Sequence, residues 1–235
     1  FIIEETFRAG YSVEKVANLT KISKPFLEEM KNALARLLIS EKSPSWLSEL
    51  KGLGFSDQQI ANQWQCPEQD IRKLRKEWQI TPGYKRVDTC AGQLRTNSPY
   101  FYSTYQGIDE PLDKQGESVV VIGSGPIRIG QGLEFDYATV HAIKAIRKLG
   151  YRAVIINNNP ETVSTDFDIS DALYFEPLTL GDVLPILERE KPLGVIVQFG
   201  GQTSIKLASG IANAGYKILG SSVDTIDRAE DRERF

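Results

Sequence analysis

The chain has 235 residues, of which 41% are hydrophobic and 25% are charged, a balance typical of globular proteins. No apolar run approaches the roughly 18 residues that span a bilayer, and the first residues do not resemble a secretory leader. Two cysteines, Cys66 and Cys90, are too few for a disulfide framework. The composition excludes a membrane-embedded or disulfide-stapled protein, and we expect a reducing, cytoplasmic location.

Charge is divided unevenly along the chain. Residues 1–86 carry 14 Lys and Arg against 11 Asp and Glu, a net of +3, whereas the remainder carries 14 against 20, a net of −6. This asymmetry favours two separately built units. The sequence starts at Phe1 and stops at Phe235 within a helical pattern, and we expect it to be a piece of a longer protein.

Residues 1–82 are predicted to be helical. Ser23 can cap a helix whose apolar residues recur at spacings of three and four. Ser45 can cap a second helix that Gly52 and Gly54 would end. The apolar residues of the first of these helices are Phe26, Leu27, Met30, Leu34, Leu37 and Leu38.

An internal repeat lies within this helical part. Residues 10–18 match residues 54–62 at an offset of 44 positions. The second copy contains the capping-box pair Ser56 and Gln59, and Pro67 then stands where another helix would begin. The repeat predicts two copies of one helix–turn–helix unit in a compact α-domain.

The pattern changes after residue 82. Residues 83–117 are rich in Gly, Pro, Tyr, Thr and Ser, and we interpret them as an extended connector. From residue 118 to residue 235, Val/Ile-rich runs alternate with helical patterns, which predicts a doubly wound, Rossmann-like parallel sheet. The predicted strands are 118–122, 152–157, 173–175, 194–198 and 217–219, and the predicted helices are 132–149, 180–190 and 204–214.

A glycine-rich loop follows the first of these strands. Gly123 and Gly125 fit the start of a dinucleotide fingerprint, but Arg128 occupies the third glycine position and Gly130 comes two residues late. The second strand ends at Asn157, where a nicotinamide site needs an acidic side chain for the ribose. Both departures argue against a nicotinamide cofactor.

Polar loops follow three of the predicted strands. Because open α/β sheets bind ligands at the carboxyl ends of their strands, we expect these loops to contact a ligand or a partner. The alternative is that they supply only turn and capping chemistry. The candidate contact residues are Gly125, Gly130, Asn159, Gly200, Gly201, Gln202 and Thr203.

Several long motifs resemble the large subunit of carbamoyl-phosphate synthetase, and the resemblance extends over almost the whole chain. Four of them resemble the start of its second, carbamoyl-phosphate-forming half, and two resemble the junction between its halves. The four are GPIRIGQGLEFDY (125–137), NPETVSTD (159–166), FGGQT (199–203) and IDRAEDR (226–232), and the two are YKRVDTCA (84–91) and YSTY (102–105).

The resemblance implies an α-helical oligomerisation domain, present in part, followed by a preATP-grasp domain. The family is a ligase of arginine or pyrimidine biosynthesis that makes carbamoyl phosphate from bicarbonate, glutamine-derived ammonia and two ATP. The resemblance also implies that the partners of this chain are ATP-grasp modules, a regulatory domain, a glutaminase small subunit and other large subunits. ATP and Mg²⁺ or Mn²⁺ belong to the ATP-grasp modules, so we expect no catalytic residue, cofactor or metal ligand in this chain, and no activity from it alone.

The family passes carbamate between its halves through an internal tunnel. Matched motif by motif, Arg128, Gly132, Glu134 and Glu161 would line that route. An arginine offers a planar, permanently charged donor fork to a carboxylate-like passenger. The alternative is a buried cluster of Arg128 with the two carboxylates that only holds loop to loop.

Other features have simpler interpretations. The repeat and the basic run at residues 72–76 would also suit a helix–turn–helix DNA-binding module, although the interleaved acidic residues favour a solvated helix face. A pure interaction module is a further alternative. His141 has no partner at metal-ligand spacing, and Asp166, Asp168 and Asp171 lack the glycine and closing glutamate of a calcium loop.

Overall fold

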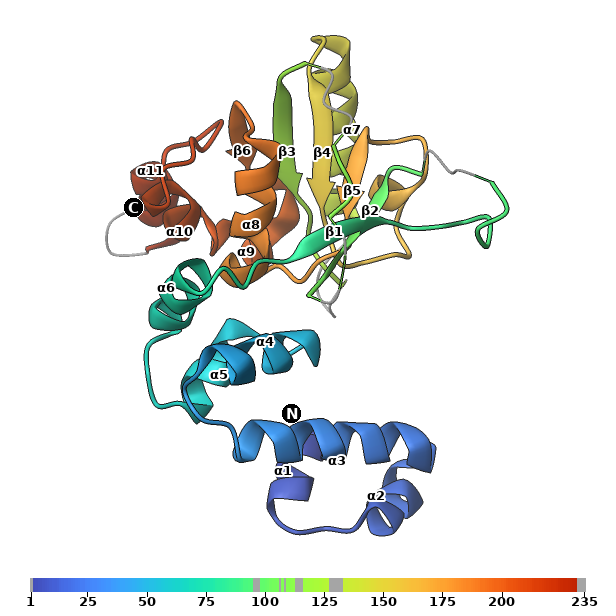
Figure 1. Cartoon of the computed structure of the whole chain (residues 1–235). Coiled ribbons are helices and arrows are strands. Elements are labelled where there is room, and N and C mark those ends of the chain that lie inside the picture. Colours follow the sequence, from blue (N-terminus) through green and yellow to red (C-terminus); the bar gives the residue numbers. More distant parts are fainter. Residues whose placement is uncertain are drawn as a thin grey trace. The chain divides into compact units, whose positions relative to one another are not determined.

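The computed structural model in Figure 1 describes residues 2–94, 98–105, 107, 109–112, 116–126 and 133–231. The chain forms two units, Phe1–Thr81 and Pro82–Phe235. No helix in these ranges is long and apolar enough to cross a membrane.

The first unit is built from helices around one apolar core. Leu27, Leu37, Leu47, Ile60 and Ile71 are fully or almost fully buried in it. The helices are α1 (Ile2–Arg8), α2 (Val13–Thr20), α3 (Lys24–Leu38), α4 (Pro44–Gly52), α5 (Asp57–Gln63) and α6 (Glu68–Glu77).

The 44-residue repeat extends further in three dimensions than in the sequence. Helices α3 and α6 begin 44 positions apart. Gly10 and Gly54, which precede α2 and α5, have φ angles of 85° and 89°. Lys21 and Gln65, which follow these two helices, also share the left-handed region, with φ angles of 63° and 52°. The two copies therefore share their turns as well as their helices, and each copy has a preceding helix, α1 or α4.

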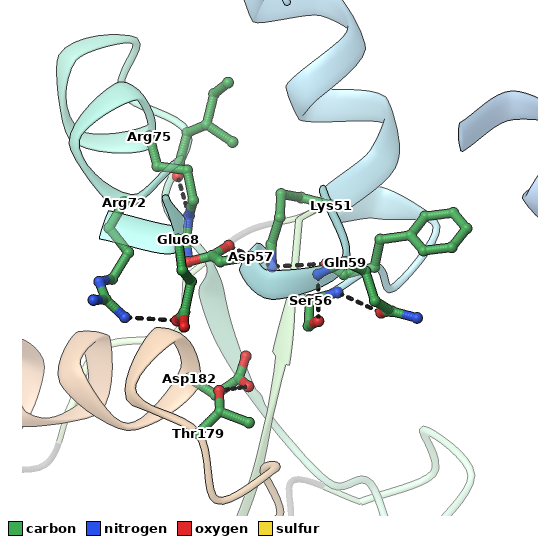
Figure 2. Close-up of polar contacts among 11 residues, drawn as sticks. Lys51, Ser56, Asp57, Gln59, Glu68, Arg72, Arg75, Thr179 and Asp182 are labelled. Atoms are coloured by element: carbon green, nitrogen blue, oxygen red, sulfur yellow. Dashed lines mark hydrogen bonds and ion pairs between the residues drawn. The ribbon is translucent and has the colours of Figure 1, made fainter. Parts of the chain in front are cut away.

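Helix starts differ in part from the predicted ones. The capping box is confirmed, since Ser56 Oγ accepts a hydrogen bond from the backbone of Gln59 at 3.2 Å and Gln59 Oε1 accepts one from the backbone of Ser56 at 2.9 Å (Figure 2). Ser45 as a cap is wrong, because α4 starts at Pro44 and Ser43 accepts the hydrogen bond from Trp46. Proline fits the first helical turn, where its missing N–H costs nothing.

The apolar stripe predicted for α3 is only half buried. Leu27, Leu34 and Leu37 enter the core, because they share one face of the helix. The other three residues stay exposed: Phe26 at 70%, Met30 at 45% and Leu38 at 42%.

A buried ion cluster lies in the second copy of the repeat (Figure 2). Arg75 donates a hydrogen bond of 2.7 Å to Asp57. The Nζ of Lys51 lies 3.0 Å from the other carboxylate oxygen and donates its hydrogen bond to the carbonyl of Phe55. All three side chains are at most 6% exposed, so this carboxylate offsets cations that are costly to bury.

The second unit contains a six-stranded sheet in the order β1-β2-β5-β4-β3-β6. Neighbouring strands are parallel except β1 and β2, which pair antiparallel. The strands are β1 (Gly83–Arg86), β2 (Tyr100–Thr104), β3 (Ser118–Ile122), β4 (Arg152–Ile156), β5 (Ala172–Tyr174) and β6 (Gly194–Ile196).

Helices cover both faces of this sheet, with α7 and α8 on opposite sides (Figure 1). Val119 and Val121 of β3 pack toward α7, whereas Val120 and Ile122 pack toward α8. Alternate residues of a strand point to opposite faces, so a doubly covered strand reads as a continuous apolar run. The helices are α7 (Glu134–Lys148), α8 (Leu180–Glu190), α9 (Gly201–Ile205), α10 (Ala208–Asn213) and α11 (Val223–Glu230).

The Rossmann-like fold class is confirmed, with local differences. The helix predicted for 204–214 is divided between α9 and α10. The last predicted strand, 217–219, forms only an isolated parallel bridge between Ile218 and Val195.

The segment interpreted as a connector contributes two strands, which the sequence did not predict. Tyr84 of β1 and Phe101 of β2 are buried. Both rings contact Tyr174 of β5, Tyr84 edge-on at 5.3 Å between centroids and Phe101 stacked at 5.2 Å. These strands are short and lie among turn-forming residues, but aromatic packing fixes them to the sheet.

Candidate functional site

The candidate site lies where polar loops follow β3, β4 and β6. Strand β3 pairs with β4 on one side and with β6 on the other, and all three are parallel. Their carboxyl ends therefore meet at one edge of the sheet. The chain passes from β3 to β4 on one side, and it returns from β5 to place β6 on the other side of β3, so the strand order reverses here. We call this edge of the sheet the rim; it comprises residues 123–126, 157–166 and 197–204.

Asn157 ties the loop after β3 to the loop after β4. Its side chain is 1% exposed, and its oxygen accepts a hydrogen bond of 3.0 Å from the backbone N–H of Gly125. The backbone N–H of Gly123 also donates to the carbonyl of Ile156 at 2.9 Å. Asn157 therefore has a structural use at the place where a nicotinamide site would have a carboxylate.

The loop after β6 lies directly against the loop after β3. A Cβ atom on Gly200 would lie 2.2 Å from the carbonyl oxygen of Gly123, so no larger residue fits without displacing backbone. Ser204 is buried beside it and donates a hydrogen bond of 2.6 Å to the carbonyl of Val197. Close backbone contact thus joins these two loops.

The loop after β4 is fixed at several points. Asn159 accepts a hydrogen bond of 3.0 Å from the backbone N–H of Glu161. Further along, the N–H of Ser164 donates to the carboxylate of Asp136 in the first turn of α7. The hydroxyl of Tyr100 donates to the carbonyl of Thr165 at 3.0 Å, so β2 also supports this loop.

The rim brings together the predicted contact residues that the structure describes. Gly125, Gly200 and Gly201 are buried, and Asn159 is 9% exposed. Thr203 is half-buried, whereas Gln202 is exposed and donates a hydrogen bond of 2.7 Å to Glu230 of α11. Glu134 and Glu161 are exposed. The remaining predicted residues, Arg128, Gly130 and Gly132, lie outside the described residues.

Sequence reasoning missed three residues that shape the rim: Asn157, Asp136 and Ser164. Asp136 and Ser164 lie inside the quoted motifs, at positions where the motif gave no separate signal. A buried polar side chain that bonds to the backbone of another loop is visible only in three dimensions. Tyr100 was missed for the same reason as its strand.

Tyrosines that support the sheet are poor acids. Burial raises the pKa of Tyr100, and the carboxylates of Asp166 and Asp168 act in the same direction. Burial also raises the pKa of Tyr174, whose hydroxyl donates a hydrogen bond of 2.6 Å to Glu190. In the structure both phenols act as hydrogen-bond donors, Tyr100 to Thr165 and Tyr174 to Glu190.

Within the described ranges, no group of three or more His, Cys, Asp or Glu side chains is placed to hold a metal. In the segment that contains Asp166, Asp168 and Asp171, the Asp171 carboxylate accepts a hydrogen bond of 2.8 Å from the backbone N–H of Ala153. Asp171 also pairs with Arg147 at 3.4 Å. This side chain is therefore used in fixing the loop to the sheet.

The basic run of α6 is engaged within the helical unit. Arg72 pairs with Glu68 at 2.6 Å (Figure 2), and Lys73 lies 3.5 Å from Asp70. Arg75 is buried against Asp57. A DNA-reading helix needs basic side chains free for phosphates and bases, so this arrangement gives no support to the DNA-binding alternative.

Two family models match the chain. Residues 1–79 match the model described as carbamoyl-phosphate synthetase large chain, oligomerisation domain. Residues 115–228 match the model described as carbamoyl phosphate synthase preATP-grasp domain. The first match lies in the helical unit, and the second contains all three loops of the rim.

Proposed function

Because the chain belongs to the carbamoyl-phosphate synthetase large-chain family, we propose that it supplies this ligase with an assembly surface and with one wall of the carbamate route. The helical unit would make the subunit contacts, and the rim of the second unit would form the wall. The observation that supports the wall is the convergence of three polar loops through Asn157 and through the contact of Gly200 with Gly123.

A carbamate route needs a particular chemistry. Carbamate hydrolyses readily, so the route has to exclude bulk water while offering polar groups to the passenger. Glu134 begins α7 and Glu161 lies in the loop after β4, and both side chains are exposed. Their carboxylates would accept hydrogen bonds from the amino group of carbamate and would discourage other anions. Arg128 would supply the cation.

We assign the ATP chemistry to other parts of the enzyme. The two matched models are described as an oligomerisation domain and a preATP-grasp domain, and neither description is that of an ATP-grasp module itself. We therefore expect ATP and Mg²⁺ or Mn²⁺ to bind to ATP-grasp modules, and the chain alone to be inactive. The partners would be those modules, the regulatory domain, the glutaminase small subunit and other large subunits.

The number of ATP molecules used per carbamoyl phosphate formed tests whether the rim lines the carbamate route. In the large chain supplied with ammonia and bicarbonate, the combined Glu134→Gln and Glu161→Gln variant should consume clearly more than two ATP per carbamoyl phosphate, because carbamate escapes and hydrolyses. Measuring ADP and carbamoyl phosphate in the same reaction gives this ratio.

A matched control is Glu117→Gln. Glu117 is exposed and precedes β3, at the opposite end of the strand from the rim. This variant should keep the parent ratio. If the rim variant also keeps that ratio, the two glutamates do not line the route.

A further inference from the structure

We infer that Asp136 is a positioning residue that fixes Glu161 relative to Glu134. The inference rests on the proposed function, since the position of these glutamates matters only if they line a route. Asp136 lies two residues after Glu134 in α7 and holds the loop that contains Glu161.

The geometry of the contact is specific. Both carboxylate oxygens of Asp136 accept a hydrogen bond from the backbone N–H of Ser164, each at 3.2 Å. Ser164 belongs to the short 3₁₀ helix Val163–Thr165, and its side chain contributes nothing to the contact. Asp136 is 6% exposed and Ser164 is 1% exposed, so water does not compete for this bond.

The place of Asp136 in its helix explains how a buried carboxylate is tolerated. It is the third residue of α7, where free backbone N–H groups and the positive end of the helix dipole favour a negative charge. An aspartate at this position commonly serves its own helix. Here it reaches across to another loop, and it thereby joins the start of α7 to the loop after β4.

The chain between Glu161 and β5 has further anchors. The hydroxyl of Tyr100, from β2, donates a hydrogen bond to the carbonyl of Thr165. Arg147, in the last turn of α7, donates hydrogen bonds to the carbonyls of Asp168 and Ile169. The Asp136 contact lies nearer to Glu161 in the sequence than these anchors, and it comes from the turn of α7 that contains Glu134. Its loss would therefore leave the loop attached while changing the place of Glu161 relative to Glu134.

The test compares Asp136→Ala with Asp136→Asn in the large chain supplied with ammonia and bicarbonate. We expect Asp136→Ala to raise the ratio of ADP to carbamoyl phosphate and to speed hydrogen exchange of the Ser164 amide by about five- to tenfold, the effect of one lost hydrogen bond. Asp136→Asn keeps an acceptor oxygen, so its ratio of ADP to carbamoyl phosphate and its exchange rate at Ser164 should both stay close to those of the parent. Partial unfolding of the variant would lower the amounts of ADP and carbamoyl phosphate alike, so it would not change their ratio.

A matched control is Asp70→Ala, which also removes an aspartate from the third position of a helix. Asp70 is paired with the exposed Lys73 of the same helix, and this pair joins α6 to no other loop. Removal of Asp70 should therefore leave the ratio of ADP to carbamoyl phosphate and the exchange of the Ser164 amide unchanged.

If the Glu134 and Glu161 variant raises the ratio and Asp136→Ala does not, the positioning role is overturned while the route stands. If Asp136→Asn is as impaired as Asp136→Ala, positioning by this hydrogen bond is also overturned. An unchanged ratio in the glutamate variant overturns the proposed route itself.

Discussion

Asp57 holds two buried cations at a place where the first copy of the repeat has no such cluster. The residue 44 positions earlier is Val13, and the position equivalent to Lys51 is Phe7, which is buried in the apolar core. The fold of the repeat therefore does not require the ion cluster. The second copy has a charged contact where the first copy has an apolar one, and its three charges depend on one another.

We predict that Asp57→Val, which introduces the residue of the first copy, destabilises the helical unit by about 3 kcal/mol or more, because Lys51 and Arg75 lose their shared carboxylate in a buried place. Urea unfolding followed by circular dichroism measures this change. Asp70→Ala removes an exposed pair instead and should cost at most about 1 kcal/mol. Equal losses in the two variants would contradict the role of the cluster.

At the scale of elements, prediction succeeded where local patterns and tertiary packing agree. The strand at 118–122 and the helix at 180–190 appear with the predicted bounds, because a doubly covered strand and an amphipathic helix each have a strong pattern of their own. Strands β1 and β2 were missed because they are stabilised by their pairing with each other and by packing against Tyr174. Both are contacts between distant parts of the sequence, so a short stretch of sequence does not reveal them.

The candidate site was predictable to the same extent. The topology predicted that the loops containing Gly125, Asn159 and Gly200 share one edge, and the structure places them there. The bonds that hold the loops together were not predictable. Asn157 and Asp136 act on the backbone of loops distant in sequence, so no spacing rule reveals them.

The repeat yields a prediction about its turns. Lys21 and Gln65 occupy the left-handed region, which costs a residue with a side chain about 1 kcal/mol relative to glycine. We predict that Lys21→Gly and Gln65→Gly each stabilise the helical unit by about 0.5–1 kcal/mol. Thermal unfolding provides the measurement.

The control for this prediction is Lys31→Gly, an exposed site within α3, which should destabilise by about 1 kcal/mol. Opposite signs at Lys21 and Gln65 would show that the two turns are not equivalent.

At the scale of the whole molecule, the helical unit has a surface that suits its family match. The helical unit, which matches the oligomerisation model, exposes Phe26 and Met30 one turn apart on α3. Exposed apolar side chains at this spacing form one patch, and such patches often mark association sites.

We predict that the chain associates as its concentration rises, and that Phe26→Glu with Met30→Glu weakens this association at least about tenfold by placing charges in an apolar contact. Sedimentation velocity over a concentration series measures it. Lys31→Glu, at an exposed neighbouring position of α3, is the control for added charge. Unchanged association in the double variant would place the contact elsewhere.

If the rim guides an intermediate and takes no part in the phosphate chemistry, a change in the rim should leave the separate ATP-dependent steps intact. The most direct measurement separates the two ATP-dependent steps of the large chain from its overall synthesis, using the Glu134→Gln and Glu161→Gln variant. We predict that bicarbonate-dependent ATP hydrolysis and the transfer of phosphate between carbamoyl phosphate and ADP both keep the parent rate, while carbamoyl phosphate formed per ATP falls. A loss of either separate step that matches the loss of overall synthesis would instead show that the rim takes part in the phosphate chemistry.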